Sequence, residues 1–310
     1  MRKTQKSSIQ HPASSIHLTS EIETKALALG FAAVGFATAK ASETIGAYRQ
    51  WLDDGFAGDM QYLHRHAEIK EHPEKVAPGV KTIIAIAARY PLNTEPGSGF
   101  TSCARGLDYH DVIRFKLRVL ATHINDIQPL NVHRVCVDSA PLLEREWAMR
   151  AGIGWQGKQG QLINPVAGSC FLLGFLLVDI ELEPSTPLKN QCGDCNLCVE
   201  SCPTGAALGN SRVDARKCLS YLTIEPSSVV PEEMKQAMQG VLFGCDCCTA
   251  ICPWNKCATA PVMPEFEELM SLPSAQDILK WSEDDFKMRF KGTAVYRTGL
   301  AQLKRNANYL

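Results

Sequence analysis

The stretch "CGDCNLCVESCP", residues 192–203, holds four cysteines and ends in a Cys-Pro pair. The cysteines are separated by two, two and three residues, the C-x2-C-x2-C-x3-C-P spacing typical of proteins with two 4Fe–4S clusters. In such proteins the first three thiolates bind one cluster, and the fourth, here Cys202, binds the other. The spacing therefore predicts further cysteine ligands elsewhere in the chain.

A second run, "CDCCTAICP" at residues 245–253, supplies most of these ligands. When it is aligned on its own Cys-Pro pair, its first position falls on Leu242, which cannot bind iron. Cys218 lies between the two runs and is the natural replacement. We therefore predict one cluster on Cys192, Cys195, Cys198 and Cys252, and another on Cys202, Cys218, Cys245 and Cys248. Cys247 breaks the spacing and is either a bystander or an alternative ligand.

Other uses of these cysteines agree less well with the sequence. Zinc is often held by two Cys-x2-Cys pairs, but it needs neither a third cysteine at the same interval nor the Cys-Pro ending. A disulfide framework needs an oxidising compartment, and residues 1–20 contain no apolar segment typical of a secretory signal. We therefore expect a cytoplasmic protein whose other cysteines are mostly buried or incidental reduced thiols: Cys103, Cys136, Cys170 and Cys257.

Composition limits the remaining possibilities. The chain of 310 residues is long enough for about two domains, and its 45% hydrophobic content provides for a sizeable core. The net charge of −1 excludes a global field that attracts nucleic acid, so an RNA partner would need a local basic patch. The longest apolar run, residues 170–178, is too short to cross a bilayer and predicts a buried strand.

Helical and extended patterns alternate before the first cysteine run. We expect helices over residues 20–30 (capped by Ser20), 44–55, 109–126 and 141–152, and strands over residues 32–37, 81–90, 133–138 and 169–182. The alternation predicts a layered α/β domain over residues 20–183, preceded by a flexible tail over 1–19. A cluster domain over 184–262 and a basic segment over 263–310 complete the chain.

These observations predict a reductase in which two clusters pass single electrons to a group held by the α/β domain. No G-x-G-x-x-G sequence follows a strand and no phosphate-binding P-loop is present. A pure electron carrier is the simplest alternative, but two clusters alone need only a small fold, and about 180 residues precede the first run. Residue spacing alone does not identify the electron acceptor.

Longer motifs indicate the acceptor through a resemblance. The sequences "DYHDVIR" (108–114), "VDSAPLLEREWAMRAGIGWQGK" (137–158), "VDARKCLSYLTIE" (213–225) and "RTGLAQLKRN" (297–306), with the cysteine runs, closely resemble the epoxyqueuosine reductase family from about residue 20 onward. This resemblance implies a nitroreductase-like α/β domain that binds cobalamin, followed by a ferredoxin-like domain with two 4Fe–4S clusters. It also implies the last step of queuosine biosynthesis, reduction of epoxyqueuosine to queuosine at the wobble position of tRNA anticodons. We expect a monomer that receives electrons from a flavodoxin- or ferredoxin-type donor. A reductive-dehalogenase-like corrinoid enzyme is the alternative.

The implied chemistry requires a proton donor, and the resemblance assigns this role to Asp138. Removal of an epoxide oxygen as water takes two electrons and two protons. Cob(I)alamin, to which the clusters would deliver the electrons, is a suitable two-electron centre. Because Asp138 follows an apolar strand, we expect burial to raise its pKa and to keep a proton available near neutral pH. Alternatively, Asp138 or Ser139 caps the helix that follows.

The resemblance implies further contacts. Those with cobalamin are Lys70, Asp138, Leu162, Leu173, Glu225, Cys245 and Asp246. For Leu162 and Leu173, ordinary core packing explains the residue type equally well. Contacts with the nucleoside or tRNA are Tyr109, His110, Lys158, Ser220, Lys304 and Arg305. Lys158 would neutralise either a corrin side chain or an RNA phosphate, and a histidine on a helix is often merely structural.

The sequence departs from the family pattern at three positions, Ser102, Gln159 and Gly160, all near the expected pocket. We also expect that this protein lacks the helical-repeat extension of many members. Residues 286–310 carry six basic residues and no acidic one. This bias predicts a phosphate-binding patch, and the alternative is a solvated tail that offsets the preceding acidic "SEDD" sequence.

Overall fold

The computed structural model describes residues 15–92, 99–225, 230–238 and 240–309. Its main sheet has the strand order β1-β2-β6-β3, and every neighbouring pair is antiparallel. The four strands are β1 (Ala33–Thr38), β2 (Thr82–Arg89), β3 (His133–Cys136) and β6 (Phe171–Val178). Two short strands, β4 (Trp155–Gln156) and β5 (Leu162–Ile163), form a separate pair. The predicted strands are thus confirmed, in a mixed α/β fold.

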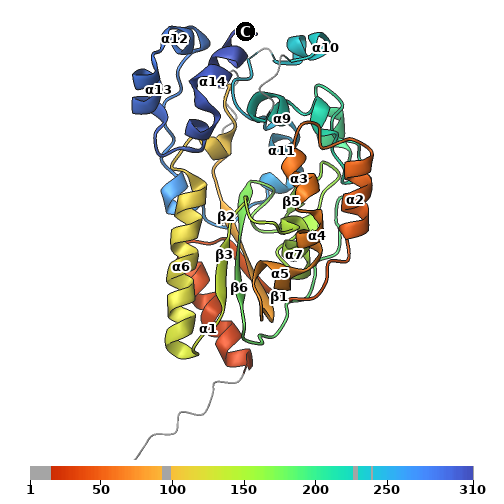
Figure 1. The fold of residues 1–310 in the computed structure, drawn as a ribbon, viewed down its shortest axis with the longest axis vertical. Helices are drawn as coiled ribbons and strands as arrows, with labels where there is room; N and C mark the ends of the chain where they lie inside the picture. Colours follow the sequence, from red (N-terminus) through yellow and green to blue (C-terminus); the bar gives the residue numbers. More distant parts are fainter. Residues whose placement is uncertain (1–14, 93–98, 226–229, 239, 310) are drawn as a thin grey trace, which may run out of the picture.

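Helices cover both faces of the sheet (Figure 1). The helices α1 (Ser15–Ala28) and α6 (Tyr109–Ile127) lie on one face, and α7 (Glu144–Arg150) lies on the other. Four further helices lie on the α7 side: α2 (Ile45–Asp53), α3 (Gln61–Arg65), α4 (Ala67–Glu71) and α5 (Pro73–Val76). The layered arrangement predicted from the alternating patterns is therefore present.

The central strand β2 explains why the sheet has two apolar cores. Its alternate side chains enter opposite faces, as the period of a strand requires. Ile84 and Ile86 join the core beneath α1 and α6, whereas Ile83 and Ala85 join the core beneath α7. Because both faces are covered, the strand is an almost continuous apolar run.

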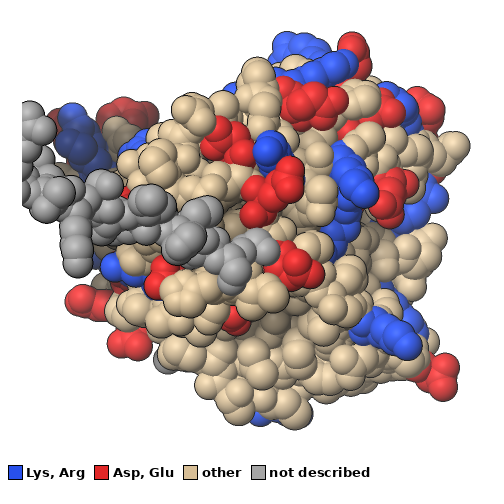
Figure 2. All heavy atoms as spheres, turned by 90° about the horizontal axis from the view of Figure 1, so that it is seen from below, with Lys and Arg blue, Asp and Glu red and all other residues tan. Residues whose placement is uncertain are grey.

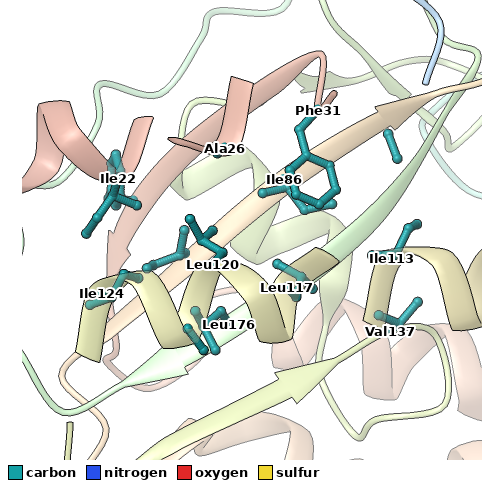
Figure 3. Packing of buried hydrophobic residues seen from close by; sticks show 14 of the residues in the cluster. Ile22, Ala26, Phe31, Ile86, Ile113, Leu117, Leu120, Ile124, Val137 and Leu176 are labelled. Carbon is teal, nitrogen blue, oxygen red and sulfur yellow. The ribbon is translucent and has the colours of Figure 1, made fainter. Parts of the chain in front are cut away.

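The core beneath α6 follows from the helical spacing of its apolar residues (Figure 3). Ile113, Leu117, Leu120 and Ile124 recur at intervals of three or four residues and are fully buried against the sheet. On the other face, glycine allows α7 to approach β1 closely, because a Cβ at Gly35 would lie 1.8 Å from the carbonyl oxygen of Ala151. These contacts fix the two elements that flank the candidate site.

The first helix begins earlier than the sequence predicted. We expected Ser20 to cap a helix over 20–30, but α1 begins at Ser15 and Ser20 lies inside it. Leu18 is buried against the same core as Ile22 and Ala26, so the apolar face of α1 extends one turn toward the N-terminus. The expected tail therefore does not reach residue 19, and residues 1–14 lie outside the described part of the chain.

The cysteine-rich and C-terminal segments lie together at one end of the sheet (Figure 1). Their helices are α8 (Leu197–Glu200), α9 (Leu219–Ile224), α10 (Glu232–Lys235), α11 (Cys247–Ala250), α12 (Ala275–Lys280), α13 (Glu283–Phe290) and α14 (Gly299–Ala307). Phe286, Phe290 and Leu303 form a buried cluster with Phe100 and Phe243. The alternative of a solvated C-terminal tail is therefore wrong. The boundaries of the domains remain a prediction.

Charge is dispersed on the face shown in Figure 2, where basic and acidic side chains are interspersed and neither sign forms a continuous patch. This dispersal agrees with the net charge of −1. Among the described residues, no helix is both long enough and apolar enough to cross a membrane.

Candidate active site

Asp138 lies in the loop that follows β3 and has a left-handed backbone, with φ of 58°. This region is uncommon for residues other than glycine, although aspartate tolerates it better than most. The backbone N–H of Asp138 donates to Glu144 Oε1 at 2.8 Å, so the first residue of α7 supports the turn. The N-cap position of α7 belongs to Leu143. The alternative in which Asp138 or Ser139 caps this helix is therefore wrong.

The carboxylate of Asp138 contacts two residues from the start of α6. His110 Nε2 lies 2.9 Å from Asp138 Oδ2, and the Tyr109 hydroxyl donates to the same oxygen at 3.3 Å. The Tyr109 and His110 rings stack with their centroids 4.0 Å apart. The structure thus brings together three residues that the sequence analysis placed in the pocket, and it leaves 61% of the Asp138 side chain exposed.

A second carboxylate fixes the other side of the His110 ring. Asp108 caps α6 by accepting the His110 backbone N–H, and its Oδ1 lies 2.7 Å from His110 Nδ1. Its other oxygen, Oδ2, accepts hydrogen bonds from Arg297 Nε at 3.0 Å and Nη2 at 2.9 Å. Both Asp108 and His110 are buried. The imidazole is therefore held between two carboxylates.

These contacts reverse the expected ionisation of Asp138. Its hydrogen bond with His110 is the largest influence on the carboxyl group, and the pKa of Asp138 is lowered instead of raised. Burial lowers the pKa of His110, but the hydrogen bonds to Asp108 and Asp138 outweigh burial and raise it. The expectation of a raised Asp138 pKa is therefore wrong for this structure, because the proton of the pair is favoured on the imidazole.

Other ionisable side chains surround Asp138. Burial and the Asp138 charge raise the pKa of Glu144 to about 7. Burial lowers the pKa of Lys70, whose ammonium group donates to the Leu142 carbonyl at 3.3 Å. The Tyr62 hydroxyl lies 3.4 Å from Glu225 Oε1, and burial raises the pKa of Glu225. The Asp138 charge acts on all four groups, so Lys70 and Glu225 lie near the predicted proton donor.

The candidate apolar contacts lie on the α7 side of the sheet. Leu162 is 4% exposed and Leu173 is partly buried, and both pack within the core beneath α7. Nearby in the sequence, Gln159 is 2% exposed, and neither polar atom of its side chain has a hydrogen-bond partner among the described residues. Buried amides are nearly always hydrogen-bonded, so the unpaired amide of Gln159 is consistent with a polar partner from a bound ligand.

Asp246, another candidate cofactor contact, is fixed by the loop that departs from the family pattern. It accepts hydrogen bonds from Thr101 Oγ1 at 2.5 Å and from both the backbone N–H and the Oγ of Ser102 at 2.7 Å. Ser102 therefore orients the segment that carries the second cysteine run.

The cysteines of the first predicted cluster lie near one another. Burial raises the pKa of Cys198, and the charges of Cys252, Cys192 and Cys195 raise it further. Cys252 is buried beside Trp155 and Ile163, with Cys192 packed against the same group. The set is drawn from both cysteine runs, as the spacing predicted, and its chemistry suits an iron–sulfur cluster.

The second predicted set also converges. Burial raises the pKa of Cys248 to about 12, and Cys218 and Cys202 contribute to the shift. Cys245 packs against the same apolar cluster as Cys218 and hydrogen-bonds the side chain of Cys247. In the described ranges, no three His, Cys, Asp or Glu side chains are arranged to hold a single metal ion. A four-iron cluster places each thiolate on a different iron, so its ligands lie farther apart.

Two of the four basic or polar side chains outside the pocket that we expected to contact tRNA hydrogen-bond within the protein. Lys158 donates to Asn196 Oδ1 at 2.9 Å, which ties it to the first cysteine run. Arg305 donates to the Leu222 carbonyl at 2.5 Å and to Asn306 Oδ1, so this side chain joins α14 to α9. Ser220 lies within α9, partly buried, and Lys304 lies within α14, also partly buried.

Sequence reasoning missed four members of the site: Asp108, Glu144, Arg297 and Tyr62. Asp108, Glu144 and Arg297 lie inside the motifs quoted above, and the helix-capping position of Asp108 was a usable signal. Arg297 was interpreted as a phosphate contact because it lies in a basic segment, whereas it pairs with a carboxylate 189 positions away.

Two family models match parts of the chain. The family model described as "Epoxyqueuosine reductase QueG, DUF1730" matches residues 70–139. The model for a 4Fe–4S double cluster binding domain matches residues 191–255, which include both cysteine runs.

Curated relatives match most of the chain. The epoxyqueuosine reductase of Aliivibrio fischeri is 40% identical over 303 residues, covering 93% of this chain and 81% of the relative. The corresponding protein of Escherichia coli is 37% identical over 300 residues, covering 93% and 79% of the two chains.

Solved structures have the same fold. Epoxyqueuosine reductase from Streptococcus thermophilus matches with a TM-score of 0.83 and 29% identity, covering 94% of this chain and 80% of that one. An epoxyqueuosine reductase crystallised with an epoxyqueuosine-modified tRNA-Tyr stem loop matches with a TM-score of 0.86 and 28% identity, with the same coverage. Because relatives of up to 40% identity match over most of both chains, the chain belongs to the epoxyqueuosine reductase family.

Proposed function

We propose that this protein reduces epoxyqueuosine to queuosine at the wobble position of tRNA anticodons. The observation that carries the proposal is the solvent-accessible carboxylate of Asp138, which a buried imidazole contacts at 2.9 Å. Removal of an epoxide oxygen as water requires a group that delivers protons to that oxygen. The match to a relative crystallised with an epoxyqueuosine-modified stem loop supports tRNA as the substrate.

The electrons for this reduction would come through the two clusters. The first would be held by Cys192, Cys195, Cys198 and Cys252, and the second by Cys202, Cys218, Cys245 and Cys248. Cys247 remains an alternative ligand, since its side chain lies beside Cys245. Iron–sulfur clusters supply electrons one at a time, so we infer a flavodoxin- or ferredoxin-type donor. The protein would act as a monomer.

The residues that the resemblance assigns to cofactor contacts also fit a cobalamin. Leu162 and Leu173 would contact the apolar corrin ring, and Lys70, Glu225, Cys245 and Asp246 would contact its polar periphery. The buried amide of Gln159, which has no partner among the described residues, supports a polar ligand in this region. When bound, the cobalamin would supply two-electron reducing chemistry.

The chain's own residues would bind the nucleoside and move the proton. Tyr109 and His110 would line the nucleoside pocket, because their stacked rings adjoin the Asp138 carboxylate. Lys158, Ser220, Lys304 and Arg305 would contact tRNA, although the internal contacts of Arg305 give it a structural role as well. Lys287 and Lys291 are exposed and are the better candidates for phosphate contacts in the C-terminal helices.

The test is mass spectrometry of nucleosides from epoxyqueuosine-containing tRNA, after incubation with protein loaded with iron, sulfide and cobalamin and given a reductant. We expect queuosine to form with the wild-type protein and only when cobalamin is present. Asp138→Asn should lower turnover by about a hundredfold or more, the usual range for loss of a general acid. Asp111→Asn, a change of the same type at an exposed position on α6, should leave turnover unchanged.

Two outcomes would contradict the proposal. If no queuosine forms although both clusters and cobalamin are bound, the substrate is wrong. If Asp138→Asn retains wild-type turnover, Asp138 is not the proton donor and the search moves to Tyr109 and His110.

A further inference from the structure

We propose that His110 supplies the proton that Asp138 passes to substrate, and that Arg297 positions this relay through Asp108. This inference rests on the proposed function and extends it to Asp108 and Arg297, and it gives His110 a role beyond lining the nucleoside pocket. It concerns a continuous line of contacts, Arg297–Asp108–His110–Asp138, that runs from the C-terminal helical region to the exposed carboxylate.

Each contact along the line is short and fixed. Arg297 lies in a 3₁₀ helix (Ala294–Thr298). It donates hydrogen bonds from Nε and Nη2 to Asp108 Oδ2, at 3.0 and 2.9 Å. The other Asp108 oxygen lies 2.7 Å from His110 Nδ1, which leaves Nε2 facing Asp138 at 2.9 Å. Asp108 also caps α6 through the His110 backbone. The imidazole therefore cannot turn away from Asp138 without breaking a hydrogen bond.

Charges alternate along the line: guanidinium, carboxylate, imidazolium, carboxylate. The groups that face His110 are Asp108 from its own helix cap, Asp138 from the loop after β3, and the stacked Tyr109 ring. Beyond these, Arg297 pairs with Asp108, and Glu144 contacts the backbone of Asp138. Two carboxylates on a buried imidazole favour its protonated form, in agreement with the raised pKa of His110.

The proposed step transfers one proton and no electrons. The His110 Nε2–H bond breaks and an O–H bond forms at Asp138 Oδ2, so imidazolium and carboxylate become neutral imidazole and carboxylic acid. Asp138 then passes this proton to the substrate oxygen and returns to the carboxylate. His110 is buried whereas 61% of the Asp138 side chain is exposed, so the imidazolium keeps a proton beside Asp138 when bound substrate covers that side chain. The relay supplies one of the two protons that the reduction consumes, and water supplies the other.

Arg297 acts in this scheme as a positioning residue. Its fork of two nitrogens fixes the orientation of Asp108, and a lysine would keep the charge but lose the two-point contact. This role differs from the phosphate contact that its basic surroundings suggest. Loss of a positioning residue lowers kcat, whereas loss of a phosphate contact raises the KM for tRNA.

The first experiment measures the ionisation of His110 without substrate. Imidazole NMR signals of the cluster-loaded protein are followed through a pH titration, with the His110 signal assigned by its loss in His110→Gln. We expect His110 to titrate above the ordinary histidine value of about 6.5. Asp108→Asn should lower this pKa, because the ring loses a carboxylate partner, whereas Asp111→Asn should not. An unchanged His110 pKa in Asp108→Asn would overturn the relay independently of any result with tRNA.

The second experiment measures single-turnover rates and steady-state constants against pH. A group that donates a proton is active when protonated, so the wild-type rate should fall as pH rises through the raised pKa of His110. Asp108→Asn should move this decline to lower pH. Glu144→Gln is the discriminating variant, since the pKa of Glu144 is raised to about 7. If the decline disappears in Glu144→Gln, the titrating group is Glu144 and the relay is wrong.

The role of Arg297 is tested by Arg297→Lys. We expect kcat to fall about tenfold or more with the KM for tRNA unchanged, because misplacement of a catalytic group lowers the rate of the chemical step. The matched control is Arg289→Lys in α13, where the guanidinium donates to Ser271. A raised KM with unchanged kcat in Arg297→Lys would show that Arg297 binds tRNA and does not position the relay.

Discussion

The α/β layers and the cysteine-rich segment are stabilised in different ways. The layers contain a 19-residue helix and two eight-residue strands that close over fully buried isoleucines and leucines. In the described residues of 190–257 the α-helices have only four to six residues. Leu197, Leu208 and Ile251 are exposed there, although Leu219, Leu222 and Met238 form a small buried cluster. Apolar burial can hold the first region, whereas we expect the second to depend also on bonds between its thiolates and metal. The chain thus joins a scaffold with two large apolar cores to a segment with a smaller core and two groups of thiolates.

Removal of iron should separate the behaviour of the two regions most strongly. Protein prepared without iron should be cut by a protease within residues 190–257, because the short helices there lose the metal bonds that organise them. Residues 15–182 should stay protected, and mass spectrometry of the fragments measures both regions. Equal protection of the two regions would show that the cysteine-rich segment folds without metal.

Single cysteine changes should show which thiolates the second cluster needs. Cys218→Ala should lose about half of the eight irons expected for two four-iron clusters, because one cluster lacks a ligand. Cys247→Ala should lose little iron, since Cys247 falls outside the predicted register. Iron and sulfide analysis of the purified variants measures the difference. An equal loss from Cys247→Ala would reassign the second cluster.

A core change should act only on the scaffold. Leu117→Ala removes a fully buried side chain beneath α6 and should lower the free energy of unfolding by about 2–5 kcal/mol, measured by urea denaturation. Iron per folded chain should stay at the wild-type value. The control is Phe115→Ala on the same helix, whose side chain is 66% exposed and whose loss should change stability by about 0.5 kcal/mol or less. A loss of iron in folded Leu117→Ala would mean that the two regions are not independent.

The sequence predicted those parts of the fold that local patterns encode. The helix α6 and the strands β2 and β6 were predicted because their apolar residues follow the periods of a helix and of a buried strand. The beginning of α1 was missed because Leu18 contacts a core formed by residues far along the chain. Convergence of the cysteines from both runs followed from spacing, because iron–sulfur ligation imposes a short list of intervals.

The electrostatics of the site could not be predicted in the same way. The position of Asp138 after an apolar strand suggested burial, but the loop turns its carboxylate toward solvent and toward His110, 28 residues earlier. The pairing of Arg297 with Asp108 joins residues 189 positions apart. No local pattern encodes contacts of this kind, and they decide which residue carries the proton.

The late position of Arg297 also gives the site an order of assembly. A nascent chain emerges from the ribosome N-terminus first, and its domains generally fold in that order. Asp138 and both cysteine runs therefore leave the ribosome before Arg297 does. A growing chain can gather its iron ligands while Asp108 still lacks its cationic partner. Full proton delivery would then be acquired only after the cysteines that handle electrons are already available.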